Sequence, residues 1–257
     1  HTITVFPTPH AAFSVTPVSS TFSDPDVPVT LVNQTFPAPG TWSYNWSFGD
    51  GTFSQDQHPA PHLYTTWGEL ANGFQIPITL TVVNGTCRDE VTNYITIRAP
   101  QPVATFVPDV AAGCPPLKVL FEDKNTKYAK TFEWDFGDGT TSTSRRPEHI
   151  FSEPGKYSVM LTAKGDGGEH STHTLIEVYR RPAVDFKFAP EKLQLPHAKA
   201  QFLNLTHLGS VYEWTFGDGA TSTEENPEHA YQDPGYYDVT LYARSEHGCE
   251  ATRTKKD

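Results

Sequence analysis

The sequence is poor in methionine, cysteine and basic side chains. Its 257 residues include one methionine, three cysteines, and 19 lysine and arginine residues against 30 acidic ones, for a net charge of −11. A surface of this sign repels nucleic acid, and no basic stripe offsets the repulsion, so nucleic-acid binding is excluded as a function. No apolar run is long enough to cross a membrane, which excludes a membrane span within this sequence.

Long helical periodicity is also missing, whereas 22 prolines and 18 glycines are present. Many turns between short strands are typical of an all-β fold. The strongest feature is a hexapeptide that occurs three times, at Trp46–Gly51, Trp134–Gly139 and Trp214–Gly219. The tryptophans are 88 (134 − 46) and 80 (214 − 134) residues apart, so each repeat has the length of a small β-sandwich domain.

Each hexapeptide predicts a strand that runs into a turn. In the second copy Phe132, Trp134 and Phe136 alternate with acidic residues, which indicates one buried face and one solvent face. Asp138-Gly139 then predicts a tight hairpin turn in which both residues have positive φ. We expect Trp46, Asp50, Gly51, Trp134, Asp138, Gly139, Trp214, Asp218 and Gly219 to be structural residues of this motif.

Two further motifs follow each hexapeptide. Pro147–Phe151 and Pro227–Tyr231 share a Pro-Glu-His-x-aromatic pattern, and His58–Tyr64 is a looser version. Pro154–Ala163 and Pro234–Ala243 then begin with Pro-Gly and alternate strictly, as a turn and a half-buried strand do.

Together these motifs resemble the PKD domain, an immunoglobulin-like sandwich of extracellular proteins. The resemblance implies an all-β fold of tandem immunoglobulin-like β-sandwiches in an extended array, and it covers almost the whole chain. It is weakest over residues 65–76, where the first copy has a longer connection. The expected division is a last strand and linker of a preceding repeat at 1–9, then domains at 10–100, 101–182 and 183–257, the third lacking part of its last strand. We expect residues 2–6 to complete the third domain of another copy, because exposed strand edges recruit strands.

The repeated polar residues allow two interpretations. Asp50, Asp138 and Asp218 could ligate calcium, but a calcium site needs six to eight oxygens, and an aspartate in such a turn more often bonds its own backbone. No cofactor is therefore expected, with calcium kept as a hypothesis. The histidines His62, His149 and His229 are expected to be structural, since three identical active sites in a row would be unusual. No catalytic motif is found, so the chain is not expected to be an enzyme.

Four aromatic residues are candidates for a ligand or partner surface: Trp42, Tyr64, Trp67 and Phe74. They lie outside the repeat pattern or near its irregular loop, where aromatic rings can stack on sugars or anchor a protein. The alternative, equally weighted for Trp67, is that the ring packs the longer loop against its own domain.

The three cysteines, Cys87, Cys114 and Cys249, fall one in each repeat. Two are expected in the loop before the last strand and one between the first two strands, which are opposite ends of such a sandwich. No disulfide among them is therefore predicted.

The expected function is that of a non-catalytic extracellular interaction or spacer segment of a larger cell-surface or secreted protein. Two alternatives remain: an adhesin module that binds polysaccharide or a host or matrix protein, and a component of a bacterial secretion or gliding assembly. Gly113–Leu117 and Asn226–Tyr231 resemble the style of surface proteins associated with gliding motility and type IX secretion. Proteins of the cell envelope or matrix are the expected partners.

Overall fold

The computed structural model describes residues 7–23, 26–37, 42–196 and 198–256. In these ranges the chain forms 23 β-strands and one short 3₁₀ helix, η1 (Leu70–Asn72). The prediction of an all-β fold of tandem immunoglobulin-like sandwiches is confirmed. The interaction proposed for residues 2–6 lies outside the described residues.

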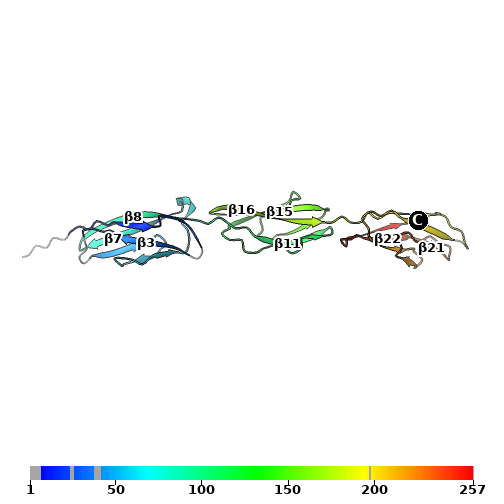
Figure 1. Ribbon diagram of the computed structural model, residues 1–257, viewed down its shortest axis with the longest axis horizontal. Coiled ribbons are helices and arrows are strands. Elements are labelled where there is room, and N and C mark those ends of the chain that lie inside the picture. Colours follow the sequence, from blue (N-terminus) through cyan, green and yellow to red (C-terminus); the bar gives the residue numbers. More distant parts are fainter. Residues whose placement is uncertain (1–6, 24–25, 38–41, 197, 257) are drawn as a thin grey trace, which may run out of the picture. The chain divides into compact units, whose positions relative to one another are not determined.

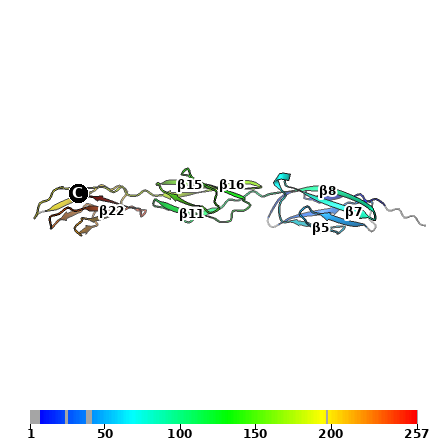
Figure 2. The ribbon, with the colours of Figure 1, turned by 180° about the vertical axis from the view of Figure 1, so that it is seen from behind.

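The first sandwich pairs a three-stranded sheet with a five-stranded one (Figure 1). The smaller sheet has the order β1 (Phe13–Thr16), β3 (Val27–Asn33), β6 (His62–Tyr64). The larger has the order β2 (Ser19–Thr21), β8 (Cys87–Arg98), β7 (Gln75–Asn84), β4 (Ser43–Ser47), β5 (Phe53–Ser54). Strands β7 and β8 form a long antiparallel hairpin, seen side by side in Figure 2.

The second sandwich has the same plan. Its smaller sheet has the order β14 (Glu148–Phe151), β11 (Leu117–Asp123), β9 (Phe106–Pro108). Its larger sheet has the order β10 (Ala112–Gly113), β16 (Gly168–Val178), β15 (Gly155–Gly165), β12 (Thr131–Asp135), β13 (Thr141–Ser142). Strand β10 pairs in parallel with the end of β16, as β2 does with β8 in the first sandwich.

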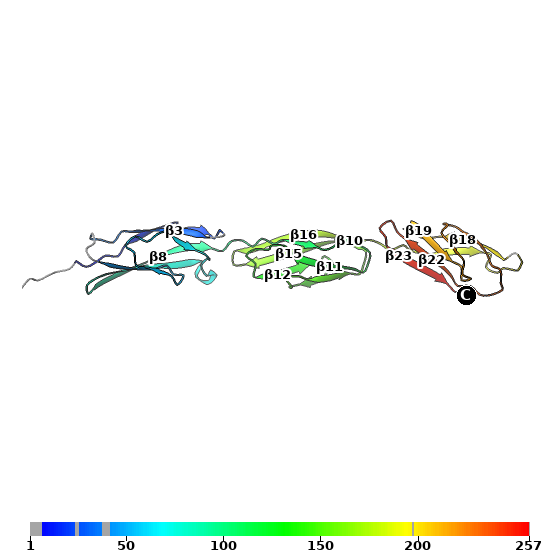
Figure 3. The same ribbon diagram turned by 90° about the horizontal axis from the view of Figure 1, so that it is seen from below.

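The third sandwich repeats the arrangement with one strand fewer in its larger sheet. The smaller sheet has the order β17 (Phe186–Ala189), β18 (Lys199–Asn204), β21 (Glu228–Ala230). The larger has the order β20 (Thr221–Ser222), β19 (Val211–Thr215), β22 (Val239–Arg244), β23 (Glu250–Lys255). Figure 3 shows β22 and β23 side by side, and they pair antiparallel over six positions.

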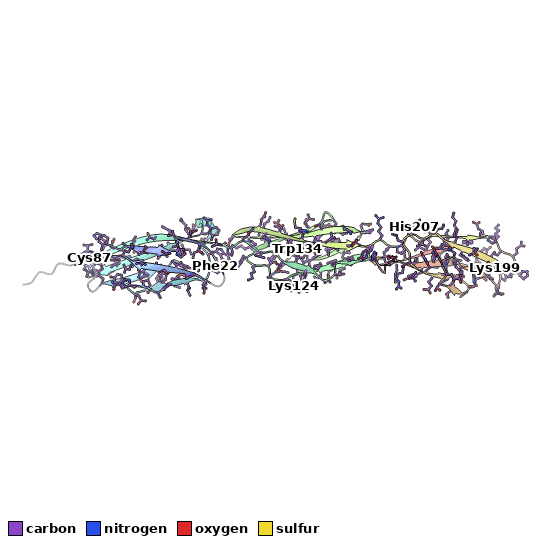
Figure 4. The ribbon with its side chains drawn as sticks, viewed as in Figure 1. Phe22, Cys87, Lys124, Trp134, Lys199 and His207 are labelled. Atoms are coloured by element: carbon purple, nitrogen blue, oxygen red, sulfur yellow. A yellow bond between two sulfur atoms is a disulfide. The ribbon has the colours of Figure 1, made fainter. Side chains whose placement is uncertain are left out.

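A tryptophan of the hexapeptide fills the core of each sandwich. Trp46, Trp134 and Trp214 are each at most 1% exposed, and Figure 4 shows Trp134 inside its sandwich. Strand alternation explains this position, because every second residue of β4, β12 and β19 points between the two sheets. Burying a large apolar side chain contributes roughly 1.5–3 kcal/mol, so these rings are a major part of each core.

The chain divides into two compact units. One holds residues 1–104 together with 126–131 and 163–170, and the other holds 105–125, 132–162 and 171–257. The loops at one end of the second sandwich therefore belong with the first unit. The rest of the second sandwich belongs to the other unit, together with the third sandwich.

Candidate functional site: a repeated aspartate–histidine pair

The structure brings one aspartate of each hexapeptide against one histidine of the next motif. The imidazole Nε2 lies 2.7 Å from the carboxylate Oδ2 in the first repeat, 2.6 Å in the second and 2.7 Å in the third. The pairs are Asp50 with His62, Asp138 with His149, and Asp218 with His229. Because an ionised carboxylate can only accept, the ring donates from Nε2.

The two partners of a pair come from different sheets. Asp138 follows β12 of the larger sheet, whereas His149 lies on β14 of the smaller sheet. Both side chains are mostly buried, with 22% and 16% of their surface exposed. The pair therefore ties the two sheets together at the rim of the sandwich.

The second oxygen of each aspartate is committed to its own turn. Asp138 Oδ1 accepts a bond from the backbone N–H of Thr140 at 3.0 Å and one from its hydroxyl at 2.6 Å. Asp50 makes the same two bonds to Thr52, and Asp218 accepts from the backbone N–H of Ala220. Each aspartate thus bonds the backbone of its own turn.

Hydrogen bonds lower the pKa of all three carboxyls. Burial is the largest single influence and would raise the pKa of Asp138, but the bonds from Thr140 and His149 together outweigh it. Burial likewise opposes the shift at Asp50 and Asp218, and hydrogen bonds again lower the pKa, from Thr52 and His62 to Asp50 and from the Ala220 backbone and His229 to Asp218. Charged aspartate is therefore the form that the folded state favours.

Aromatic rings hold each histidine in place. His149 stacks on Phe136 of the hexapeptide, with ring centroids 4.1 Å apart, and meets Phe151 edge-on at 4.6 Å. The stacks on Phe48 and Phe216 are equivalent, at 4.1 Å and 4.2 Å. The imidazole is therefore fixed on one face, on one edge and at Nε2.

The turn differs from the tight hairpin predicted for Asp138-Gly139. Strand pairing stops at Asp135 and Thr141, and the N–H of Phe136 bonds the carbonyl of Thr140, which closes a longer loop. The residues with positive φ are Gly137 and Gly139, at 77° and 89°, and not the aspartate. The prediction of the turn type was wrong because the aspartate side chain, and not a two-residue turn, completes the backbone bonding.

This geometry lacks the parts of a catalytic triad. The hydroxyl nearest to the histidine belongs to Thr52 or Thr140, 3.4 Å and 3.5 Å away, and it already donates to the aspartate. In the third repeat Ala220 stands at that place and has no hydroxyl. Over the described ranges no group of three or more histidine, cysteine or acidic side chains could hold a metal ion. The calcium hypothesis has no cluster to support it there.

From the sequence, both members of each pair are expected to be structural, but the pattern does not connect them. The available signal was their near-constant separation of 12 (62 − 50), 11 (149 − 138) and 11 (229 − 218) residues. In each repeat the aspartate follows a strand of the larger sheet, and the histidine lies on a strand of the smaller sheet.

The four candidate surface aromatics have different environments. Tyr64 is 0% exposed, burial raises its pKa, and its hydroxyl donates to the carbonyl of Phe48, so it is a core residue. Trp42 is half-buried and packs against the first core. Phe74 is also half-buried and has a positive φ of 63°.

Trp67 lies in the longer loop and makes contacts on both sides. Its ring packs on the first core, edge-on to Phe22, and also meets Tyr128 at 6.2 Å. Its indole N–H donates to Asp166 Oδ2 at 3.0 Å, and Lys130 reaches the other oxygen of that carboxylate at 2.6 Å. The longer loop of the first repeat therefore buttresses loops 126–131 and 163–170 in the same compact unit.

The prediction that the cysteines form no disulfide was wrong. Cys114 and Cys249 are bonded across 135 residues, and Cys87 is free. The prediction compared the two ends of a single sandwich, where these loops are far apart. The bond instead joins the loop before β11 of the second sandwich to the hairpin before β23 of the third.

Comparisons with known proteins agree with the repeat. The family model described as "PKD domain" matches residues 98–178 and 205–257. Human polycystin-1 is 27% identical over 206 residues, which are 76% of this chain and 4% of that protein. Collagenase ColA of Bacillus cereus is 35% identical over 81 residues, covering 30% of this chain and 8% of the relative.

The metalloprotease PrtV of Vibrio cholerae is 28% identical over 139 residues, with 49% of this chain and 14% of the relative covered. The chain thus spans under a fifth of the length of these three relatives. Among solved structures, titin domains I67–I69 align over 98% of both chains, at 13% identity and a TM-score of 0.43. No helix among the described residues is long and apolar enough to span a membrane.

Proposed function

The chain belongs to the PKD domain family, and we propose from this membership that it is a non-catalytic segment of a larger extracellular or cell-surface protein. In that protein it projects or connects other domains and contacts proteins of the envelope or matrix. The relatives are named as a polycystin, a collagenase and a metalloprotease, and the aligned part is a small share of each. We propose that this segment accompanies such activities and does not perform them.

One observation carries the non-catalytic proposal. The polar groups that recur in every repeat are committed to internal contacts: the carboxylate to its turn and the imidazole, the imidazole to two aromatic rings. A general base needs a proton to remove within hydrogen-bond reach, and here the hydroxyl beside the histidine already donates to the aspartate. The arrangement fits a brace between two sheets.

The disulfide supports the extracellular proposal. Disulfides persist in oxidising compartments, such as the periplasm and the cell exterior, and are rare in the cytosol of mesophiles. The Cys114–Cys249 disulfide therefore favours a location in such an oxidising compartment. The net charge of −11 suits a segment that stays in solution between other domains.

A hydrolysis assay tests the non-catalytic proposal. The purified chain is incubated with gelatin, casein and a panel of polysaccharides, and the products are measured. We expect no turnover above buffer. Turnover that is lost in His149→Ala but kept in His173→Ala, a histidine exposed on β16 of the same repeat, would overturn the proposal.

A second candidate function is adhesion. Tyr236 is 88% exposed in the loop before β22, and an exposed ring can stack on a sugar or enter a pocket of a protein. A glycan array and a panel of matrix proteins test this candidate, with Tyr236→Ala as the variant. Saturable binding that is lost in Tyr236→Ala would favour the adhesin over the spacer.

The narrower placement, in a gliding or type IX secretion system, rests on the motif style of Gly113–Leu117 and Asn226–Tyr231. Its test is deletion of this segment from the parent gene in the native bacterium. Unchanged gliding and unchanged secretion of the parent would count against it.

A further inference from the structure

The disulfide between Cys114 and Cys249 has a mechanical consequence that goes beyond linking two loops. We propose that it makes the chain a tension bypass: a pulling force on the two ends crosses from Cys114 to Cys249 through the sulfurs and leaves residues 115–248 unloaded. The proposal that the disulfide carries a pulling force in the parent protein rests on the proposed spacer function, in which the segment connects other domains. The covalent path itself does not depend on that function.

The bypassed segment contains nearly all of two sandwiches. It has 134 residues (248 − 115 + 1) and includes every strand from β11 to β22. Of the strands in the second and third sandwiches, only β9, β10 and β23 remain in the covalent path. Unfolding of the bypassed strands therefore adds nothing to the length of the stretched chain.

The pulling force also reaches and leaves the Cys114–Cys249 disulfide through β-strands, whose backbone is already extended. Gly113 ends β10, which pairs in parallel with β16, and the next residue is Cys114. Cys249 directly precedes β23, which pairs with β22 over six positions. Tension on β23 therefore runs along its own backbone to the sulfur, and the ladder to β22 does not have to break for the force to pass.

Contacts other than the disulfide hold the two cysteines together. The guanidinium of Arg181 donates to the carbonyl of Pro115 at 2.6 and 3.1 Å, and to the carbonyl of Glu250 at 3.3 Å. These are the residues that follow Cys114 and Cys249 in the sequence. Beside them, the rings of Tyr179 and His247 stack with centroids 3.9 Å apart.

This arrangement assembles the bond from the folded thiols. The sulfur–sulfur bond between the two cysteines forms as the one in an oxidant such as glutathione disulfide breaks. The two cysteines together give up two protons and two electrons, which convert the glutathione disulfide into two glutathione molecules. Holding two reacting groups close converts their reaction into an effectively intramolecular one. Arg181 is therefore a positioning residue for closure of the bond.

Single-molecule pulling tests the bypass. The whole chain is tethered by its two ends and stretched to full unfolding, as wild type and as the Cys114→Ser/Cys249→Ser variant. At about 3.3–3.6 Å per residue, the oxidised wild type should be about 440–480 Å shorter in contour length than the variant. The first sandwich lies outside the covalent loop, so its unfolding step should appear in both and calibrate the traces.

Two controls separate the bypass from other effects. Wild type treated with dithiothreitol should reach the length of the double variant, and Cys87→Ser should keep the short wild-type length, because Cys87 is free. Equal contour lengths for oxidised wild type and double variant would overturn the proposal. The measurement involves no substrate or partner, so its failure is distinct from a failure of the spacer function.

The role of Arg181 has its own test. After reduction, the folded chain is reoxidised in glutathione buffer and the fraction with the Cys114–Cys249 bond is followed by mass spectrometry. Arg181→Ala should close the bond several-fold more slowly than wild type, and Arg180→Ala, at an exposed neighbour, should not. Equal rates for all three chains would remove the positioning role.

Discussion

Replacing His149 by alanine should destabilise the second sandwich. The change removes the stack on Phe136, the edge contact with Phe151 and the bond to Asp138. Each aromatic contact is worth about 0.5–1.5 kcal/mol. The bond to the carboxylate, which is partly exposed, adds at most about 1 kcal/mol. We therefore expect a loss of about 1–4 kcal/mol in the free energy of opening.

Native-state hydrogen exchange is the suitable assay, because it resolves the stability of one sandwich within a chain of three. The expected loss corresponds to roughly 5- to 900-fold faster exchange in peptides from β11, β14 and β15. The control is His173→Ala, which removes an exposed histidine from the same sandwich and should cost less than about 0.5 kcal/mol. If His149→Ala exchanges within 0.5 kcal/mol of wild type, the brace interpretation is refuted.

Three further outcomes follow from the geometry. The folded pKa of Asp138 lies below its unfolded value, so the charged carboxylate stabilises the fold above about pH 4, and this contribution is lost as the pH falls through the lowered folded pKa. In urea unfolding, the difference in unfolding free energy between wild type and Asp138→Asn should narrow below about pH 4. A difference that does not change with pH would contradict this. Gly137→Ala should lower the melting temperature more than Gly139→Ala. Both glycines have positive φ, but only at Gly137 would a new Cβ lie 3.0 Å from a backbone oxygen of β15. An equal fall in melting temperature for the two variants would exclude a clash at Gly137. Trp67→Phe should increase hydrogen exchange in residues 163–170, because it removes the N–H that donates to the Asp166 carboxylate, whereas Trp42→Phe should not. Unchanged exchange in both variants would show that Trp67 does not stabilise this loop.

Much of the fold could be predicted because the sequence repeats a strong local signal. The alternation around Trp134 predicts both the strand and its buried face, and three copies of it predict three cores. The turn was harder to predict. Two-residue turns are selected by backbone preferences, whereas this turn depends on the side chain of Asp138, whose carboxylate accepts the backbone N–H of Thr140 and the ring N–H of His149.

The disulfide could not be predicted by considering each domain separately. Whether Cys114 and Cys249 approach depends on how the end of one sandwich meets the start of the next, which local patterns do not encode. The same applies to Trp67, whose partner Asp166 is 99 residues away. Long-range polar contacts between repeats depend on side chains with no regular spacing, so only the structure reveals them.

We propose that each aspartate–histidine pair braces its own sandwich and carries no activity. The most direct test is hydrogen exchange across the whole chain in three single variants, His62→Ala, His149→Ala and His229→Ala. We expect each variant to lose protection in its own sandwich and to keep wild-type exchange in the other two. Wild-type protection in all three variants, together with loss of a binding or hydrolytic activity, would contradict it.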